Sequence, residues 1–236
     1  MIQTIDVTVA YNGGPPALRG VSVRIEKGEF VFIVGPTGTG KSTFLKLIYR
    51  EAIPQKGKVI VAGRDITRLD ERQVPYLRRQ IGIVFQDFQL LPQKTVWENV
   101  AFALQAIGAE RRRIYREVPQ ALDMVNLTHK ASAYPAELSA GEQQRVSIAR
   151  AIVNNPAIVL ADEPTGNLDP ETSWDIVQLL ARINLRGSTV VIATHDKYIV
   201  DGMRKRVIAF EHGQVVRDEA GGYHHGDTEE PGILPP

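Results

Sequence analysis

The sequence predicts an α/β protein with two additions, an antiparallel β part near the N-terminus and a helical part in the middle of the chain. Short, continuously apolar runs indicate buried strands, and they occupy residues 30–34, 81–85, 158–161 and 189–194. Strand-like segments at 4–10 and 21–25 indicate the antiparallel part. Residues 88–154 are mostly helical in pattern, over 96–107, 111–125 and 141–154.

Length and composition indicate one compact domain. With 236 residues, 43% of them hydrophobic, the chain can bury about 70% of the surface of its unfolded form. We expect a single domain over 1–218, with the helical subdomain at about 88–154. Residues 219–236 are rich in glycine, proline and acidic side chains and contain few apolar ones, so they are predicted to form a disordered tail.

Charge and cysteine content exclude several classes of function. The 28 basic and 27 acidic residues leave a net charge of +1, which argues against a polyanion-binding surface, so no direct nucleic-acid binding is expected. The absence of cysteine excludes disulfides and thiolate metal sites and is consistent with a cytoplasmic protein. No apolar run approaches the ~18 residues that span a bilayer, and the N-terminus lacks the pattern of a secretory signal.

The first segment with phosphate-binding character lies at 35–43. It follows the strand predicted at 30–34 and leads into a helix predicted at 41–50, which is the context that a Gly-x-x-x-x-Gly-Lys-Ser loop requires. Glycines let backbone N–H groups converge on phosphates, and the helix end adds a partial positive charge. The residues expected to bind ATP here are Gly35, Pro36, Thr37, Gly38, Thr39, Gly40, Lys41, Ser42 and Thr43.

Two side chains of this loop have predicted roles. Lys41 is expected to reach the β- and γ-phosphates, and the Ser42 hydroxyl to ligate Mg²⁺. The alternative is a glycine-rich turn between strand and helix that carries a surface lysine. The offsets of Gly40, Lys41 and Ser42 behind a strand favour the phosphate-binding interpretation.

An acidic pair follows the strand predicted at 158–161, at the carboxyl end where nucleotides bind in open α/β sheets. Asp162 is expected to hold Mg²⁺ through water. Glu163 is the candidate general base that aligns or activates the attacking water. The alternative, that the two acids are helix-capping charges, is disfavoured by Pro164 and the surrounding pattern.

A histidine follows the last of the core strands. His195 is the only one of the five histidines that sits at a strand end where a γ-phosphate would lie. A lone histidine is more often structural, but after a phosphate loop and an acidic strand end it indicates a hydrogen bond to the γ-phosphate. Such a contact would let the site distinguish ATP from ADP.

A second segment with phosphate-binding character, LSAGEQQR, occupies 138–145, far along the chain from the first. We call 35–43 the first cradle and 138–145 the second cradle. One nucleotide needs only one cradle. The economical explanation is that the second cradle binds a nucleotide held by another copy of the chain, so that ATP joins two copies into a dimer.

In combination, these motifs resemble the nucleotide-binding subunit of an ABC transporter. Their order is the first cradle, Gln86 after its strand, LSAGEQQR, IVLADE, NLD at 167–169 and His195, and the match covers nearly all of 1–218. The combination is far more specific than the phosphate loop alone. It implies an ABC-type core of the P-loop NTPase class, ATP hydrolysis with Mg²⁺, and a homodimer bound peripherally to the inner face of the cell membrane.

The resemblance also assigns roles to further residues. Gln86 lies in the loop that senses Mg²⁺ and couples to the membrane partner, and Asp169 in the loop that crosses the dimer interface. Tyr11 matches the aromatic residue that stacks on adenine, where such stacks contribute ~1–3 kcal/mol, although it could be an ordinary turn aromatic. The second-cradle residues implied to contact the partner's ATP are Ser139, Ala140, Gly141 and Glu142.

The second cradle departs from the family pattern Leu-Ser-Gly-Gly-Gln at two positions. Ala140 replaces a glycine, and it would be strained if its φ were positive but not if it lies in a helical turn. The helical alternative is favoured, because position 140 lies at the entry of a predicted helix. Glu142 replaces the glutamine; its charge suits a helix N-terminus, but its carboxylate must point away from the nucleotide.

Segments outside these motifs narrow the subfamily. DEPTGNLD at 162–169 resembles a group that includes lipoprotein-release and macrolide-export ATPases and a bacterial cell-division ATPase, and 65–87 resembles the division ATPase. That resemblance implies an integral membrane subunit as partner and regulation of cell-wall hydrolysis as output. An export ATPase is the alternative. A soluble ABC protein acting on nucleic acid is disfavoured, because the sequence has neither long coiled coils nor tandem cassettes.

Overall fold

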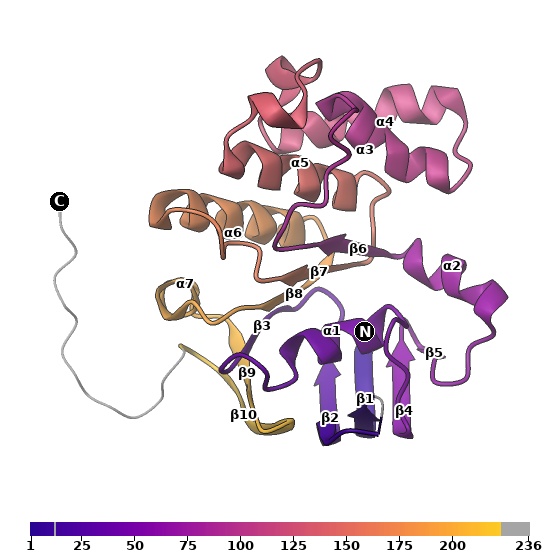
Figure 1. Cartoon of the computed structure of the whole chain (residues 1–236), viewed down its shortest axis with the longest axis vertical. Coiled ribbons are helices and arrows are strands. Elements are labelled where there is room, and N and C mark those ends of the chain that lie inside the picture. The colour runs from indigo at the N-terminus through magenta and orange to yellow at the C-terminus, as the bar shows by residue number, and fades with distance from the viewer. Residues whose placement is uncertain (12, 223–236) are drawn as a thin grey trace, which may run out of the picture.

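The computed structural model describes residues 1–11 and 13–222 of the chain. Figure 1 shows its layers: a small antiparallel sheet, helix α1 beside it, a larger sheet across the middle, and a group of helices on the far side. The small sheet has the strand order β2-β1-β4-β5, and the large sheet has the order β10-β9-β3-β8-β7-β6. The predicted α/β class with antiparallel and helical additions is therefore confirmed.

The small sheet consists of the N-terminal hairpin and two later strands. In it β1 (Ile2–Ala10) pairs antiparallel with β2 (Pro16–Ile25) and with β4 (Lys56–Val61), and β4 pairs with the short β5 (Arg64–Asp65). Side chains of β1 and β2 mostly alternate between buried and exposed, as expected where a sheet buries one face. The strands predicted at 4–10 and 21–25 are both present and begin earlier than predicted.

The four predicted core strands run parallel in the large sheet. They are β3 (Phe30–Val34), β6 (Ile81–Val84), β7 (Ile158–Asp162) and β8 (Thr189–Ala193). Nearly all of their residues are buried, because hydrophobic cores cover both faces of this sheet. The carboxyl ends of the four strands share one edge, so the residues that follow them meet there.

A C-terminal hairpin completes the large sheet. Strand β9 (Arg206–Glu211) lies parallel to β3, and β10 (Gln214–Ala220) returns antiparallel beside β9. The sequence analysis did not predict this hairpin. Strand β10 extends into 219–236, which corrects the start of the predicted disordered tail; residues 223–236 of that segment lie outside the described residues.

Helix α1 (Lys41–Ile48) lies between the two sheets (Figure 1). Its residues Phe44, Leu47 and Ile48 are buried in a core to which both sheets contribute side chains. The ring of Phe44 packs against Phe210 of β9, with the ring centroids 5.5 Å apart. The helix predicted at 41–50 is thus present and ends slightly earlier.

Three helices form the helical part: α3 (Val96–Ala106), α4 (Arg111–Met124) and α5 (Ala140–Ile152). All three were predicted, and their observed ends differ only slightly from the predicted ones. Helix α6 (Pro170–Leu185) lies between this group and the large sheet, and α2 (Val74–Arg78) and α7 (Lys197–Met203) are short helices (Figure 1). In the described part of the chain, every helix is too short or too polar to cross a bilayer.

Helix α5 packs directly on the large sheet at β6. A Cβ atom on Gly82 of β6 would clash with the carbonyl oxygen of Ala151 near the end of α5, so glycine is required for this close approach. The second cradle, at the start of α5, therefore belongs to a helix whose other end is packed on the core sheet.

Candidate active site

The first cradle connects the carboxyl end of β3 to α1, and its shape requires glycine. Gly35, Gly38 and Gly40 have φ values of 143°, 83° and 105°, which residues with side chains rarely adopt. A Cβ atom on Gly35 would clash with the carbonyl oxygen of Phe210, and one on Gly40 would lie 2.6 Å from that of Ala17. The backbone can therefore form a tight loop at a helix N-terminus, which is a favourable site for an anion.

Lys41 is the first residue of α1, and only 7% of its surface is exposed. Its Nζ donates hydrogen bonds to the carbonyl oxygens of Gly35, at 2.7 Å, and Pro36, at 3.2 Å. Nζ also lies 3.7 Å from Glu163 Oε1. The side chain is thus folded back over the loop that is predicted to hold the phosphates, where its ammonium could donate to a phosphate oxygen.

The two strongest candidate Mg²⁺ ligands face each other. The Ser42 hydroxyl donates a hydrogen bond to Asp162 Oδ1 at 3.1 Å. Burial raises the pKa of the Asp162 carboxyl; the Ser42 hydrogen bond opposes this rise, and the charge of Glu163 adds to it. A hydroxyl and one carboxylate fit Mg²⁺, which commonly takes one or two carboxylates and completes its shell with water and phosphates. No group of three or more acidic, histidine or cysteine side chains suited to a metal occurs within 1–11 and 13–222.

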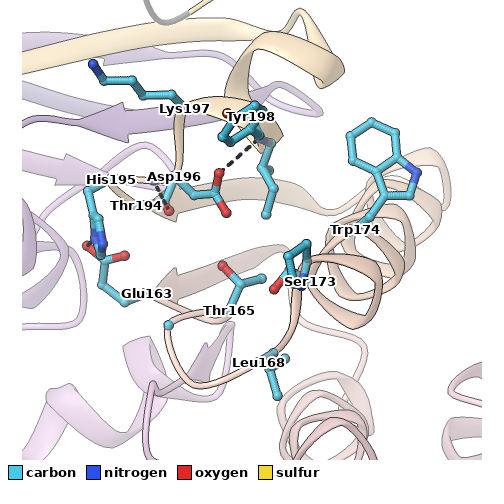
Figure 2. A pocket seen from close by; sticks show the side chains of 13 residues that line it. Glu163, Thr165, Leu168, Ser173, Trp174, Thr194, His195, Asp196, Lys197 and Tyr198 are labelled. Atoms are coloured by element: carbon cyan, nitrogen blue, oxygen red, sulfur yellow. Dashed lines mark hydrogen bonds and ion pairs between the residues drawn. The ribbon is translucent and has the colours of Figure 1, made fainter. Parts of the chain in front are cut away.

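Glu163 and His195 form a pair beside these residues, as Figure 2 shows. His195 Nδ1 lies 3.0 Å from Glu163 Oε1, and the Glu163 side chain is 16% exposed whereas that of His195 is 64% exposed. The same carboxylate oxygen therefore faces both the His195 ring and the Lys41 ammonium. This arrangement orients a largely buried carboxylate toward the first cradle, as a general base requires.

The backbone of Glu163 is strained. Its φ of 46° lies in the left-handed region, which destabilises a residue other than glycine by about 1–3 kcal/mol, and the following Pro164 restricts it further. Hydrogen bonds restrain it on both sides: Glu163 N donates to Ala193 O at 2.9 Å, and Gly166 N donates to Glu163 O at 3.2 Å. Strain that the surrounding structure maintains is common at functional sites.

A cavity of about 550 Å³ joins the first cradle to the acidic pair and His195. Its lining consists of Ala17, Thr37, Gly38, Gly40, Lys41, Ser42, Thr43, Phe85, Gln86, Asp87, Asp162, Glu163 and His195. Gln86 therefore reaches the same cavity as the first cradle. Ala17, Phe85 and Asp87 were missed: Phe85 and Asp87 flank Gln86 and could have been included, whereas no sequence pattern points to Ala17 of β2.

Tyr11 lies at the edge of this site. It is exposed, and its hydroxyl is 3.5 Å from the Thr43 hydroxyl on α1. The ring thus stands close to the first cradle without being packed into the core. This position fits a ring on which a base could stack, and the stacking itself stays a prediction.

The second cradle is the N-terminus of α5. Ser139 is its N-cap: the Ser139 hydroxyl accepts a hydrogen bond from Glu142 N at 3.2 Å, and Glu142 Oε2 accepts one from Ser139 N at 2.9 Å. The bond from the Ser139 N–H is the main cause that lowers the pKa of the Glu142 carboxyl. Ala140 is the first helical residue and is absent from the residues with positive φ, so the helical alternative holds and the alanine is unstrained.

Helix α6 meets the second cradle from the side. A Cβ atom on Gly141 would lie 2.5 Å from Thr172 Cγ2, so glycine permits this approach. Asp169 is exposed and caps α6 by accepting a hydrogen bond from Thr172 N at 2.9 Å. None of the residues 139–142 lines the cavity at the first cradle, so one copy of the chain does not bring the two cradles together.

A second cavity, of about 760 Å³, adjoins Glu163 and His195 and was not predicted. Figure 2 shows this pair at one end, Trp174 of α6 at the other, and Tyr198 of α7 between them along the upper wall. Trp174 and Tyr198 are both exposed. The cavity had no signal in the sequence, because its apolar wall comes from helices without a phosphate-binding motif.

Comparisons with known proteins were made for the whole chain. A family model described as ABC transporter matches residues 18–166. The cell division ATP-binding protein FtsE of Bacillus subtilis is 57% identical, over 94% of this chain and 97% of that protein. FtsE of Mycobacterium tuberculosis is 55% identical over 96% and 100%, and FtsE of Escherichia coli is 49% identical over 91% and 97%.

Solved structures show the same similarity. The dimeric ATP-binding cassette MJ0796, a bacterial ABC transporter cassette, is 40% identical with a TM-score of 0.84, covering 93% of this chain and 98% of that chain. A dimer of MJ0796 in a post-hydrolysis state, bound to ADP and Pi, has a TM-score of 0.82 at 39% identity over the same shares. The cassette cbiO1 from Clostridium perfringens has a TM-score of 0.87 at 31% identity, covering 93% and 88%.

Proposed function

This chain belongs to the ABC transporter family as one of its ATP-binding subunits, and on that premise we propose that it works in an FtsEX-like complex of cell division. Its reaction is the hydrolysis of ATP. The observation that carries the proposal is the convergence of Lys41, Ser42, Asp162 and Glu163 on one cavity, in a chain about half identical to several FtsE proteins along almost its whole length.

The first cradle holds the chain's own ATP in this proposal. Backbone N–H groups of the loop and the N-terminus of α1 bind the phosphates, and Lys41 donates to the β- and γ-phosphates. Tyr11 provides a face for the adenine. The 3.7 Å separation of Lys41 Nζ and Glu163 Oε1 supports this assignment, since it brings the phosphate ligand and the base to one place.

Ser42, Asp162 and Gln86 would hold Mg²⁺, with Asp162 acting through water. When bound, the ion neutralises charge on the phosphates of ATP. Glu163 accepts the proton of the attacking water, and His195, 3.0 Å from its Oε1, donates to the γ-phosphate. Because only ATP carries the γ-phosphate that His195 contacts, the site can distinguish ATP from ADP.

Two bound ATP molecules close a dimer of this chain. The second cradle of each copy, at Ser139, Ala140, Gly141 and Glu142, binds the γ-phosphate on the other. The Ser139 hydroxyl and the N–H groups of Ala140 and Gly141 are the donors, and Asp169 lies where the copies meet. Each charge-assisted hydrogen bond contributes ~1.5–3 kcal/mol, and about 5.5 kcal/mol turns a population of 1:99 into 99:1. A few such bonds at each site are therefore enough to close the dimer, and loss of the γ-phosphates reopens it.

The membrane partner, FtsX, is proposed to bind in a groove beside the Gln86 loop and so to respond to closure of the dimer. A cavity of about 340 Å³ lies there, between β6 and the helical part, and includes Ile81, Phe85, Phe102 and Ile107. Phe102 is 44% exposed, which suits an apolar contact with a partner. The chain would thus sit on the inner face of the cell membrane and regulate cell-wall hydrolysis. The relatives named above are division proteins, so the export ATPase alternative is not favoured.

The test uses purified full-length protein and the Glu163→Gln variant. We expect ATP to convert the variant to a dimer, measured by light scattering, while its hydrolysis falls by about 10²- to 10⁴-fold. Glu171→Gln, an exposed acid on α6, is the matched control and keeps wild-type hydrolysis. Unchanged hydrolysis in Glu163→Gln would refute the catalytic assignment. Failure of FtsX to co-purify with the chain from membranes would refute the division role.

A further inference from the structure

We propose that Gln144 is a positioning residue that ties the helix of the second cradle to the loops that carry Glu163 and Gln86. This inference rests on the proposed function, because it concerns how one cradle controls the base at the other. Gln144 does not line the nucleotide cavity.

Gln144 links three segments through one side-chain amide. It lies in α5, whose first residue follows the Ser139 N-cap, and it is completely buried. Its Nε2 donates to the carbonyl oxygen of Pro164 at 2.6 Å and to that of Phe85 at 3.4 Å. Pro164 directly follows the candidate base, and Phe85 directly precedes Gln86. A single amide therefore touches both catalytic loops.

The orientation of this amide follows from its neighbours. Both neighbouring groups are carbonyl oxygens, which can only accept, so the donating nitrogen of Gln144 must face them. Gln144 Oε1 then points where it has no hydrogen-bond partner among the described residues, and Ser147 Oγ, one turn further along α5, is also buried without one. An unsatisfied buried acceptor is destabilising.

Glu163 is the residue that most needs such a restraint. Its φ of 46° places it in the left-handed region, and the proline after it restricts it further. Ala193 O holds its backbone from the preceding side, through Glu163 N at 2.9 Å. On the following side, Gln144 holds the carbonyl of Pro164. Proline has no N–H of its own, so its carbonyl is the backbone group of Pro164 that can form a hydrogen bond, in addition to the bond from Gly166 N to Glu163 O.

Helix α5 therefore has a rigid connection to the base. Gln144 lies five residues after the Ser139 N-cap, about 7.5 Å along the helix axis. If a γ-phosphate of the other copy engages the second cradle, the position of α5 is set, and through Gln144 the positions of Pro164 and Phe85 are set with it. Closure of the dimer would thereby place Glu163 and Gln86 at the same time.

The first test compares Gln144→Leu with Asn184→Leu in the full-length protein. Asn184 is a matched control, since its amide also bridges segments, donating to the carbonyl oxygens of Gly28, Glu29 and Ser188 at the opposite end of the sheet. Single-turnover hydrolysis, with protein in excess over ATP, should slow about 100-fold in Gln144→Leu, because a small misplacement of a catalytic group has such an effect. ATP affinity should stay within about twofold, and Asn184→Leu should hydrolyse ATP normally even if it melts earlier.

A second variant separates positioning from stability. In the Glu163→Gln background, adding Gln144→Leu should slow hydrolysis by much less than about 100-fold, because the effect through the base is already lost and only the effect through the Gln86 loop is left. Additive losses in the double variant would overturn the proposal. Equal losses of rate in Gln144→Leu and Asn184→Leu would do so too, since they would show a general effect of weakened folding.

A third measurement does not depend on hydrolysis. Backbone amide exchange at residues 165–168 should become at least about tenfold faster in Gln144→Leu, since this turn would lose its anchor. Asn184→Leu should leave it unchanged. Unaltered amide exchange in Gln144→Leu would refute the inference, whatever the rate of ATP hydrolysis. The proposed function fails on a different result, the absence of ATP-driven dimer formation in Glu163→Gln.

Discussion

The two cradles are built differently although both use a helix N-terminus. The first is a loop of left-handed glycines between β3 and α1, and the helix N-cap, Gly40, supplies no side-chain hydrogen bond. Its N–H groups are left for an anion, and Lys41, Asp162 and Glu163 of the same chain surround it. The second is a capping box in which Ser139 and Glu142 satisfy each other, exposed at the tip of α5.

This difference indicates which site is complete on its own. The first cradle has a cation, a carboxylate for the metal and a base within one cavity, so it can bind its ligand without help. The second cradle has no ligand groups opposite it in the described chain, and its capping hydrogen bonds stabilise α5 without a ligand. This difference agrees with the proposal that the second cradle binds a phosphate held by another copy of the chain.

The largest expected effect is at the first cradle. Lys41→Ala removes a buried ammonium at the predicted phosphate site, and hydrolysis should fall by about 10²- to 10³-fold, as when a preorganised donor is removed. Lys46→Ala is the control, since Lys46 lies one turn and a half further along α1 and pairs with Glu51 at 3.0 Å instead. Steady-state hydrolysis measures both. Equal losses of hydrolysis in Lys41→Ala and Lys46→Ala would mean that the first cradle depends on positive charge in general and not on Lys41 in particular.

The next effect concerns the second cradle. Ser139→Arg fills the helix N-terminus, and ATP-driven dimerisation should weaken by about 10- to 100-fold, which corresponds to a loss of ~1.5–3 kcal/mol over the two sites together. Binding of ATP to the single chain should be unchanged, because the first cradle is intact. Ser132→Arg, another exposed serine of the helical part, is the control. Sedimentation with and without ATP measures dimer formation. If Ser139→Arg dimerises as strongly as the wild type, the second cradle does not bind the ATP of the other copy.

Tyr11→Ala should have a smaller effect, confined to the first cradle. Loss of a base stack should weaken ATP binding roughly tenfold, within the ~1–3 kcal/mol of such contacts. Tyr76→Ala, an exposed tyrosine on α2 whose ring contacts Arg79, should bind ATP normally. Equilibrium titration with a fluorescent ATP analogue compares the two. If Tyr11→Ala binds as tightly as the wild type, Tyr11 is an ordinary turn residue.

Glu142→Gln should have the smallest effect, on stability at the second cradle. Its carboxylate favours the N-terminus of α5 by about 0.3–1 kcal/mol at most, because the side chain is still 28% exposed to solvent. The pKa of Glu142 is lowered in the folded protein, so its contribution is present above the pKa of the unfolded chain and disappears as the pH falls through the folded value. Urea unfolding at neutral and acidic pH should show the two proteins converging in acid. A difference in the free energy of unfolding that does not change with pH would mean that Glu142 stabilises the protein by packing and not by its charge.

Much of the fold was predictable because it rests on local patterns. The four core strands are continuous apolar runs, and α3, α4 and α5 show helical periodicity, so each could be recognised alone. The hairpin β9–β10 was missed, since its outer strand alternates weakly and its identity as a strand depends on pairing. For the same reason, the predicted tail began inside β10.

The site was predictable where a motif carries the chemistry and not where tertiary contact does. Lys41, Ser42, Asp162 and Glu163 were found because their types stand at required offsets after strands. Their mutual contacts, such as Ser42 to Asp162, follow from the shared edge of the sheet. Gln144 and Trp174 could not be found in this way, because the importance of each depends on which distant segment happens to lie against it.

The place of α1 between the two sheets has a thermodynamic consequence. The helix that opens with Lys41 contributes Phe44, Leu47 and Ile48 to the core shared by both sheets, so nucleotide affinity and folding stability are linked. A ligand present at 100 times its dissociation constant adds about 2.7 kcal/mol to the stability of the folded state. Through α1 this gain reaches the small N-terminal sheet as well as the large one. Bound ATP therefore raises the free energy of unfolding of both sheets, and the chain without nucleotide is less stable throughout.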